Sequence, residues 1–187
     1  DSTQQKLVSV PNMTKQINGV AGSGKTQVLV QRAVNTHLYT GNPVLILSYN
    51  IALANYIRYR LNQVKADFGR SEFTILSYHR FFKMNAQSLG LKPSKRRVIN
   101  NRQESEDLQS DEFEFSYDDI DFFSAKESMT KRFNNIFIDE IQDFNPIWIE
   151  IIKRYFLASD GEIVVLGDAS QNIYHRPLDS KGQIKVE

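Results

Sequence analysis

The segment Gly19–Thr26 constrains the fold more than any other part of the chain. It reads Gly-Val-Ala-Gly-Ser-Gly-Lys-Thr and matches the pattern G-x-x-x-x-G-K-[ST] at every fixed position. Glycines let such a loop curl so that successive backbone N–H groups point toward phosphate oxygens. A helix that begins near Lys25 would add the positive end of its dipole. The segment therefore predicts a nucleoside triphosphate site, with ATP and Mg²⁺ as the expected ligands. A flexible glycine turn before a helix is the alternative.

The residue types in the loop indicate which contacts each residue makes. Lys25 is expected to reach the β- and γ-phosphates, and the Thr26 hydroxyl to bind Mg²⁺. The backbone that surrounds the phosphates is expected at Gly22, Ser23 and Gly24. The loop follows a strand candidate at residues 15–18 and opens a helical pattern, which is the context that the motif requires.

Strand and helix signals alternate along most of the chain. Apolar runs predict strands at residues 15–18, 44–47, 72–76, 136–138 and 163–166. Helical patterns follow the glycine loop, span 51–64 and 78–89, and begin again at Asn145-Pro146, with Trp148 in an apolar stripe expected in the core. Gly161 is expected to separate the last helix from the last strand. This alternation predicts an α/β P-loop fold, in which helices cover both faces of a parallel sheet.

The stretch from about residue 85 to residue 131 differs from the rest of the chain. It holds a basic run, Lys92 to Arg97, and an acid-rich segment, Glu104 to Asp121, and it has no clean period. We expect a short, partly ordered insertion here, so that residues 1–84 and 132–187 form one ATP-binding lobe. The basic run is expected to be a solvated face, and contact with a phosphate backbone is the alternative.

Two acidic residues follow the strand predicted at 136–138. Asp139 is expected to hold Mg²⁺, and Glu140 beside it can polarise a water toward the γ-phosphate. In parallel sheets, ligands collect at the carboxyl ends of the strands. Alone, two acids after an apolar strand could simply cap the next helix. Together with the glycine loop they predict the second half of a nucleotide-hydrolysing site.

Three motifs, in this order and spacing, resemble those of the superfamily 1 helicases of the UvrD/Rep type. They are the loop Gly19–Thr26, the segment Asp139–Asp143 and the segment Gly167–Gln171. Ser48-Tyr49-Asn50 looks like the first single-strand contact motif of that family, and Ser77–Phe81 looks like its Thr-Phe-His segment. The resemblance covers most of residues 1–176 and implies a RecA-like sheet.

The resemblance also implies roles for individual residues. Gln4 lies where the family has a glutamine that reads adenine. Glu140 would be the catalytic base, while Gln142 and Gln171 would sense the γ-phosphate and couple it to strand binding. The track for single-stranded nucleic acid, with DNA favoured over RNA, would be lined by Tyr49, Asn50, Tyr78 and His79.

Three departures from the family pattern limit what the resemblance implies. Gln27 stands where the family often has a nucleotide-contacting arginine. The insertion is short, so contacts with duplex are expected to be reduced. The second RecA-like lobe, which carries the arginine fingers, is not in these residues and is expected in the remainder of a longer protein. The isolated chain should therefore bind ATP but hydrolyse it weakly.

Composition restricts the partners and the compartment. The net charge of +1 does not indicate a strongly basic nucleic-acid binder, although a local groove can still be basic. No apolar run approaches the roughly 20 residues that span a bilayer, and the absence of cysteine excludes disulfides. We expect no membrane partner and a cytoplasmic location. A nucleotide-dependent switch or scaffold with a helicase-like core remains the main alternative, since a P-loop kinase would leave Gly167–Gln171 unexplained.

Overall fold

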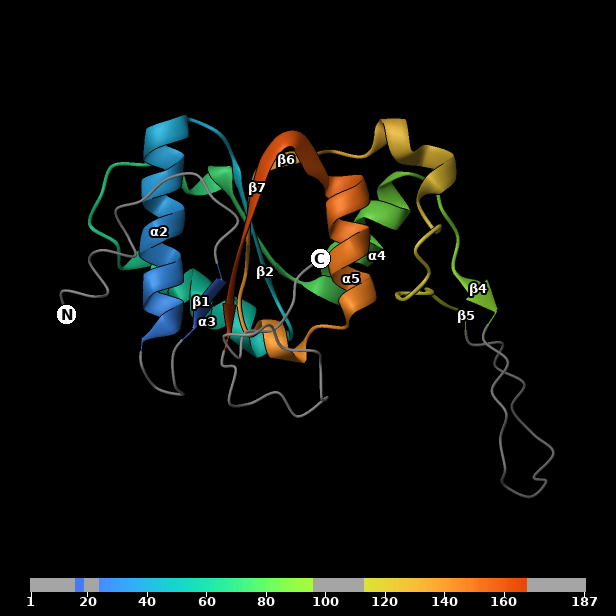
Figure 1. Cartoon of the computed structure of the whole chain (residues 1–187), viewed down its shortest axis with the longest axis horizontal. Helices are drawn as coiled ribbons and strands as arrows, with labels where there is room; N and C mark the ends of the chain where they lie inside the picture. The colour runs from blue at the N-terminus through green and yellow to red at the C-terminus, as the bar shows by residue number, and fades with distance from the viewer. Residues whose placement is uncertain (1–15, 19–23, 96–112, 168–187) are drawn as a thin grey trace, which may run out of the picture.

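The computed structural model describes residues 16–18, 24–95 and 113–167, and within them the main sheet has five parallel strands (Figure 1). The strands are β1 (Gln16–Asn18), β2 (Val44–Ser48), β3 (Phe73–Ser77), β6 (Phe133–Ile138) and β7 (Leu157–Gly167). Their spatial order is β1-β7-β6-β2-β3, so that β6 lies at the centre with β2 and β7 as its neighbours. The α/β fold class predicted from the sequence is confirmed.

Helices cover both faces of this sheet, as the sequence predicted (Figure 1). The helices are α2 (Lys25–Thr40), α3 (Ile51–Asn62), α4 (Tyr78–Ser88) and α5 (Pro146–Ile151), which continues as a π-helical turn, η4 (Ile152–Phe156). Short 3₁₀ turns are η1 (Arg70–Glu72), η2 (Ser124–Met129) and η3 (Ile141–Asp143). A separate antiparallel pair is formed by β4 (Ser94–Lys95) and β5 (Phe113–Glu114).

Strand β2 shows how the two faces share one apolar run. Val44 and Ile46 pack with α2 and α3, whereas Leu45 and Leu47 pack with α4 and α5. All four side chains are 0% exposed. Burial of each contributes roughly 1.5–3 kcal/mol to stability. An unbroken apolar run therefore marks a strand that is covered on both faces, as predicted.

The start of β7 differs from the prediction. The strand begins at Leu157, before Gly161, and its pairing with β6 shifts from Phe133↔Leu157 to Asn135↔Glu162. A Cβ on Gly161 would lie 2.8 Å from Leu157 Cδ1 and 3.0 Å from the Phe133 carbonyl oxygen. Gly161 thus marks a close approach within an irregular strand pair, and it does not mark the beginning of the strand.

The described part of the predicted insertion packs on the lobe. Phe123 is 0% exposed and lies in the core beside Phe82 of α4, with ring centroids 4.8 Å apart. The Tyr155 hydroxyl donates to the Ile120 carbonyl at 2.8 Å. These residues lie outside the strand-helix alternation but complete the core on the α4 and α5 side. The boundaries of the insertion remain a prediction.

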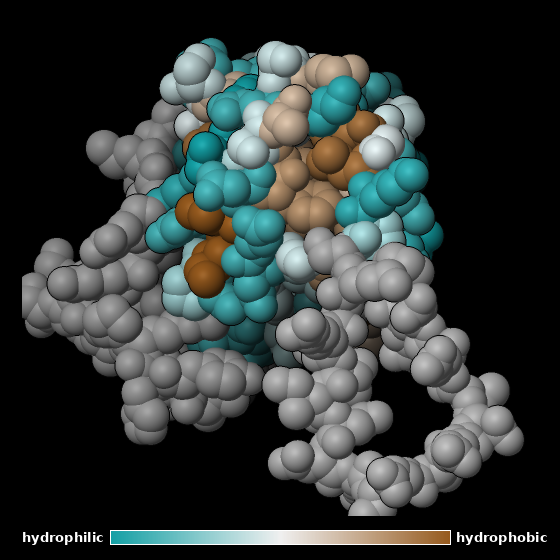
Figure 2. Space-filling model, turned by 90° about the vertical axis from the view of Figure 1, so that its right-hand side faces the viewer, coloured by the Kyte–Doolittle hydropathy of each residue, from teal (hydrophilic) through white to brown (hydrophobic). Residues whose placement is uncertain are grey.

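On that side of the molecule, hydrophobic residues reach the surface in separate patches among hydrophilic ones (Figure 2). Met84 on α4 and Met129 at the end of η2 are 47% and 63% exposed. Scattered exposed apolar residues of this kind are ordinary in globular proteins. Among the described helices, none is long and apolar enough to cross a membrane. The cytoplasmic location remains a prediction.

Candidate functional site

Helix α2 begins where the glycine loop ends. Gly24 caps it with a left-handed backbone (φ 79°, ψ 21°), a conformation that glycine adopts without steric cost, and Val28 N–H donates to the Gly24 carbonyl at 3.0 Å. The first turn contains no acidic residue, so no side chain within it offsets the positive end of the helix dipole. Lys25 in this turn is 8% exposed. The predicted start of the helix near Lys25 is confirmed.

The Thr26 side chain lies against the acidic end of β6. Its hydroxyl donates to Asp139 Oδ2 at 2.9 Å, and the other carboxylate oxygen accepts from the Glu140 backbone N–H at 3.1 Å. Asp139 N–H donates to the Leu47 carbonyl of β2 at 3.0 Å. The carboxylate is therefore held on both oxygens and is 0% exposed. The two motifs that the sequence placed far apart meet at the carboxyl edge of the sheet.

Burial is the main cause of a raised pKa at Asp139, which lies at about 6. The charge of Glu140 raises this pKa further, whereas the hydrogen bonds from Thr26 and from the backbone and the charge of Lys25 lower it. Carboxyl groups with strongly shifted pKa values cluster at functional sites, which makes Asp139 a candidate site residue. A cation beside it would compensate for its lost hydration.

The donor set of this pair fits Mg²⁺. A hydroxyl and a carboxylate are the oxygen ligands that this hard cation prefers, and it commonly completes its shell with water and substrate phosphates. Among the described residues no group of three or more acidic, histidine or cysteine side chains could hold a metal. Thr26 and Asp139 offer two oxygen ligands, and Mg²⁺ held by them would complete its shell with phosphate and water.

Glu140 has an unusual backbone and a fixed side chain. It is the one non-glycine residue with positive φ in the described chain (φ 51°, ψ 54°), and it precedes the turn η3. Such residues occur at functional sites more often than elsewhere. The Gln142 side-chain amide donates to Glu140 Oε2 at 2.5 Å, and Gln142 is 2% exposed. Glu140, the predicted catalytic base, is thus oriented by Gln142, the predicted γ-phosphate sensor.

Gly167 brings a third motif to the same place. A Cβ at this position would lie 2.6 Å from Gln142 Oε1 and 2.6 Å from Ile141 Cγ2, so a larger residue would displace one of them. The end of β7 is therefore in direct contact with the segment after Asp139. Four residues predicted for the nucleotide site lie outside the described residues: Gln4, Gly22, Ser23 and Gln171.

The residues predicted to line a strand track lie in an aromatic group at the ends of β2 and β3. Tyr49 is 37% exposed and its ring is stacked on Trp148 with centroids 6.3 Å apart. Tyr78 is 1% exposed, stacks on Trp148 at 4.5 Å and donates its hydroxyl to the Tyr117 carbonyl at 3.0 Å. Burial raises the pKa of Tyr78. His79 meets Trp148 edge-on at 4.8 Å. Of the two tyrosines, only Tyr49 offers a face to solvent.

Asn50 has a local role in the fold. Its side-chain oxygen accepts from the Leu53 N–H at 2.8 Å and so caps α3. Its carbonyl accepts from the Ser48 hydroxyl at 2.8 Å. Asn50 therefore caps α3, a role that was not predicted from the sequence, and its contact with nucleic acid remains a prediction.

The sequence analysis assigned no site role to one member of the aromatic group, Trp148, or to its hydrogen-bond partner, Asp118. Trp148 is buried, as predicted, but it also connects Tyr49 with Tyr78, and its indole N–H donates to Asp118. Trp148 could have been found from its place on the helix that follows the Asp139 motif, since β6 and β2 are neighbours. No pattern in the acid-rich segment distinguishes Asp118 from its neighbours.

A comparison with known families places most of the chain in one family. A family model described as an AAA domain matches residues 4–177, which include the glycine loop, Asp139 and Gly167. A search of curated proteins found no match to the chain. The match covers most of the sequence. The chain therefore belongs to this family of AAA domains, the ATP-binding, helicase-like P-loop modules that are found in UvrD/Rep-type helicases.

Proposed function

We propose that this chain is the ATP-hydrolysing lobe of a superfamily 1 helicase or single-strand translocase. The observation that carries the proposal is the 2.9 Å hydrogen bond from Thr26 to Asp139. It joins the first turn of the phosphate-loop helix to the acidic end of the central strand. Hydrolysis of a triphosphate requires both elements at one point, because the phosphates and the attacking water must be held together.

The residues divide the reaction between them. Lys25 neutralises charge on the β- and γ-phosphates, and Glu140 accepts the proton of the water that attacks the γ-phosphorus as the bond to ADP breaks. Gln142 positions the Glu140 carboxylate through its amide. When bound by Thr26 and Asp139, Mg²⁺ supplies further neutralisation of the phosphate charge.

Single-stranded nucleic acid, with DNA favoured over RNA, is the proposed partner at the aromatic group. Tyr49 follows β2 by one residue, and β2 is bonded to Asp139 through the Leu47 carbonyl. A nucleic-acid strand stacked on Tyr49 would thus lie at the end of β2, next to Asp139. A second RecA-like lobe, supplied by the remainder of a longer protein, would add the arginine finger.

The test uses Glu140→Gln and Lys25→Ala, with Lys83→Gln, an exposed residue of α4, as the control. Glu140→Gln should bind a fluorescent ATP analogue normally but release phosphate at least 100-fold more slowly, in line with loss of a general base. Lys25→Ala should lose nucleotide affinity. Turnover by Glu140→Gln at the rate of the unmodified chain would contradict the proposed mechanism.

A nucleotide-dependent switch that unwinds nothing is the second candidate. It is favoured by the burial of Tyr78, which leaves Tyr49 as the exposed tyrosine at this end of the sheet. Strand-stimulated ATP hydrolysis that Tyr49→Ala abolishes would favour the motor. Nucleotide-dependent binding to a protein, without stimulation by a strand, would favour the switch.

A further inference from the structure

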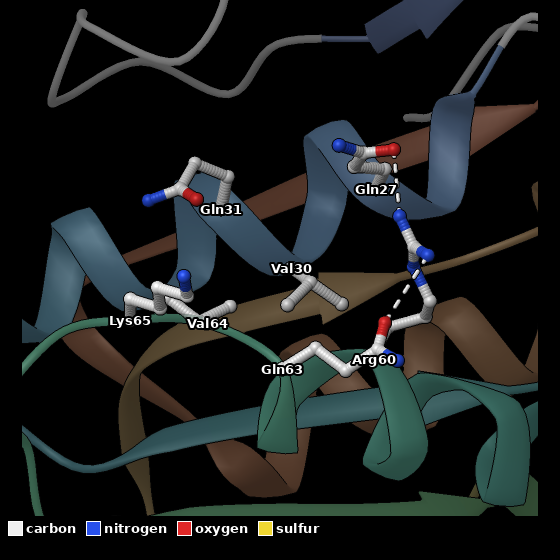
Figure 3. A pocket seen from close by; sticks show the side chains of 7 residues that line it. All are labelled: Gln27, Val30, Gln31, Arg60, Gln63, Val64 and Lys65. Atoms are coloured by element: carbon white, nitrogen blue, oxygen red, sulfur yellow. Dashed lines mark hydrogen bonds between the residues drawn. The ribbon is translucent and has the colours of Figure 1, made fainter.

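A pocket of about 170 Å³ lies between α2 and α3, beside the first two turns of α2 (Figure 3). It is lined by Gln27, Val30, Gln31, Arg60, Gln63, Val64 and Lys65. Since a water occupies about 30 Å³ in the liquid, the pocket has room for roughly six waters, or for one phosphate group. It is too small for a complete drug-sized ligand, which fills about 300 Å³ or more.

The lining of the pocket is cationic. Arg60 and Lys65 contribute positive charge, amides contribute most of the remaining polar atoms, and no carboxylate lines it. Within the described part of the chain, neither cation has an ion-pair partner. The pocket therefore favours an anion, and both cations are available to neutralise it.

The guanidinium of Arg60 is fixed across the pocket. It donates to Gln27 Oε1 on α2 at 2.6 Å and to Gln63 Oε1 at 3.3 Å, as the dashed lines in Figure 3 show. Neutral amide oxygens orient the guanidinium without cancelling its charge. A guanidinium that is held in place in this way loses less entropy when it binds a phosphate.

Two exposed aromatic rings lie on the same stripe of α3 as Arg60. Tyr56, Tyr59, Arg60 and Gln63 follow the spacing i, i+3, i+4 and i+7, which brings them to one side of the helix. Tyr56 is 48% exposed and Tyr59 is 58% exposed. Aromatic faces beside cations form the surfaces that bind single strands, because bases stack on the rings while the cations contact the backbone.

We propose that this stripe of α3 and the α2–α3 pocket together form a second binding surface for single-stranded nucleic acid. Bases stack on Tyr56 and Tyr59, and a backbone phosphate enters the pocket between Arg60 and Lys65. The surface is separate from the aromatic group at Tyr49. Because Arg60 also contacts Gln27, the residue after Thr26, a strand bound here acts on the first turn of α2.

The first experiment measures binding of fluorescein-labelled oligo(dT) to the whole chain by anisotropy, over a series of NaCl concentrations. The double variant Arg60→Gln/Lys65→Gln is compared with Lys83→Gln/Lys126→Gln, which removes equal charge elsewhere. Loss of the two cations that neutralise one backbone phosphate should lower the slope of log affinity against log salt by about 0.7, and weaken binding roughly five-fold near 0.1 M salt. An affinity and slope equal to those of the control pair would overturn the proposal.

The second experiment locates the bases. Tyr56→Ala and Tyr59→Ala should each weaken binding at least about five-fold, whereas Tyr39→Ala, a change at a 71% exposed tyrosine near the end of α2, should not. Irradiation of an oligonucleotide that contains 4-thiothymidine should give adducts on Tyr56 or Tyr59. Adducts confined to Tyr49 would overturn the proposal.

Two further outcomes separate this surface from the proposed ATPase. The Arg60→Gln/Lys65→Gln variant should keep its ATP hydrolysis measured without a strand. If it instead loses affinity for ATP and keeps affinity for oligo(dT), the pocket is a nucleotide site and the proposal is wrong. If the unmodified chain binds oligo(dT) through this surface but neither binds nor hydrolyses ATP, the ATPase proposal fails while this one stands.

Discussion

The hydroxyl of Thr26 donates a hydrogen bond to the carboxylate of Asp139, although the two residues are 113 positions apart in the chain. The bond connects the helix after the glycine loop with the central strand of the sheet. It also leaves one buried carboxylate oxygen dependent on one hydroxyl. This dependence makes the contact open to test by substitution.

Thr26→Val should destabilise the fold by about 1–3 kcal/mol, because it removes the donor from a buried acceptor while keeping the shape of the side chain. Thr26→Ser keeps the hydroxyl and should therefore lose less stability than Thr26→Val. Urea unfolding at pH 7 gives both free energies. Equal stability of the valine variant and the unmodified chain would show that the Asp139 oxygen has no need of this donor.

The pKa of Asp139 predicts a pH-dependent stability. It lies at about 6 in the folded chain, above the ordinary value of 3.8, so the folded state holds the proton more tightly than the unfolded state. The stability that this proton contributes is complete below pH 4 and is lost as pH rises through 6. Asp139→Asn should therefore match the unmodified chain near pH 4 and exceed it by about 2–3 kcal/mol near pH 7.5.

Unfolding is measured at each pH with EDTA present, because a bound cation would oppose the shift of the Asp139 pKa. A difference between the two proteins that does not change with pH would contradict the role assigned to this carboxyl. Asp139→Asn should also lose Mg²⁺-dependent ATP hydrolysis. The Asp139 carboxylate would then be required for the reaction even though it lowers the stability of the fold at neutral pH.

Gly167→Ala should disturb the contact between β7 and the Asp139 motif. Its Cβ would lie 2.6 Å from Gln142 Oε1, and relief of that overlap should cost about 1–3 kcal/mol and lower the rate of ATP hydrolysis. Gly69→Ala is the matched control, because nothing lies closer than 3.4 Å to its Cβ. If both alanine variants unfold at the same urea concentration, the Gln142 side chain can move away from a Cβ at position 167 without loss of stability, and the contact is not a tight one.

Two substitutions of Asn50 should distinguish its capping of α3 from its predicted contact with single-stranded nucleic acid. In Asn50→Ala, loss of the bond to Leu53 N–H should destabilise the protein by about 1 kcal/mol. Asn50→Asp keeps an acceptor and should restore stability, whereas its negative charge should weaken binding of an oligonucleotide that contacts this residue. Full strand affinity in Asn50→Asp would limit Asn50 to its capping role.

The elements of the fold could be predicted because their signals are local. The run Val44–Leu47 is apolar at every position, and burial on both faces follows from that alone. Asn145-Pro146 marks the start of α5, where the asparagine side chain accepts from Ile147 N–H at 3.0 Å. The meeting of Thr26 with Asp139 followed from the rule that parallel strands end at one edge.

The side-chain partners could not be predicted, because they depend on packing between distant segments. The burial of Tyr78 results from Trp148 and Tyr117, which come from a helix and from the predicted insertion. The bond from Arg60 to Gln27 spans 33 positions and joins two helices whose crossing no periodicity specifies. Sequence motifs therefore located the site, whereas the three-dimensional arrangement determined which of its side chains are exposed.

The unequal pairing of β6 with β7 leaves extra residues in β7 at one end of the sheet. Between two paired positions β6 advances by two residues, Phe133 to Asn135, while β7 advances by five, Leu157 to Glu162. Ser159 and Asp160, in the extra length, are exposed. Asp139 lies beyond the opposite end of β6. A fluorophore or a short epitope inserted at Ser159 would thus report on the lobe from the end of the sheet remote from its chemistry.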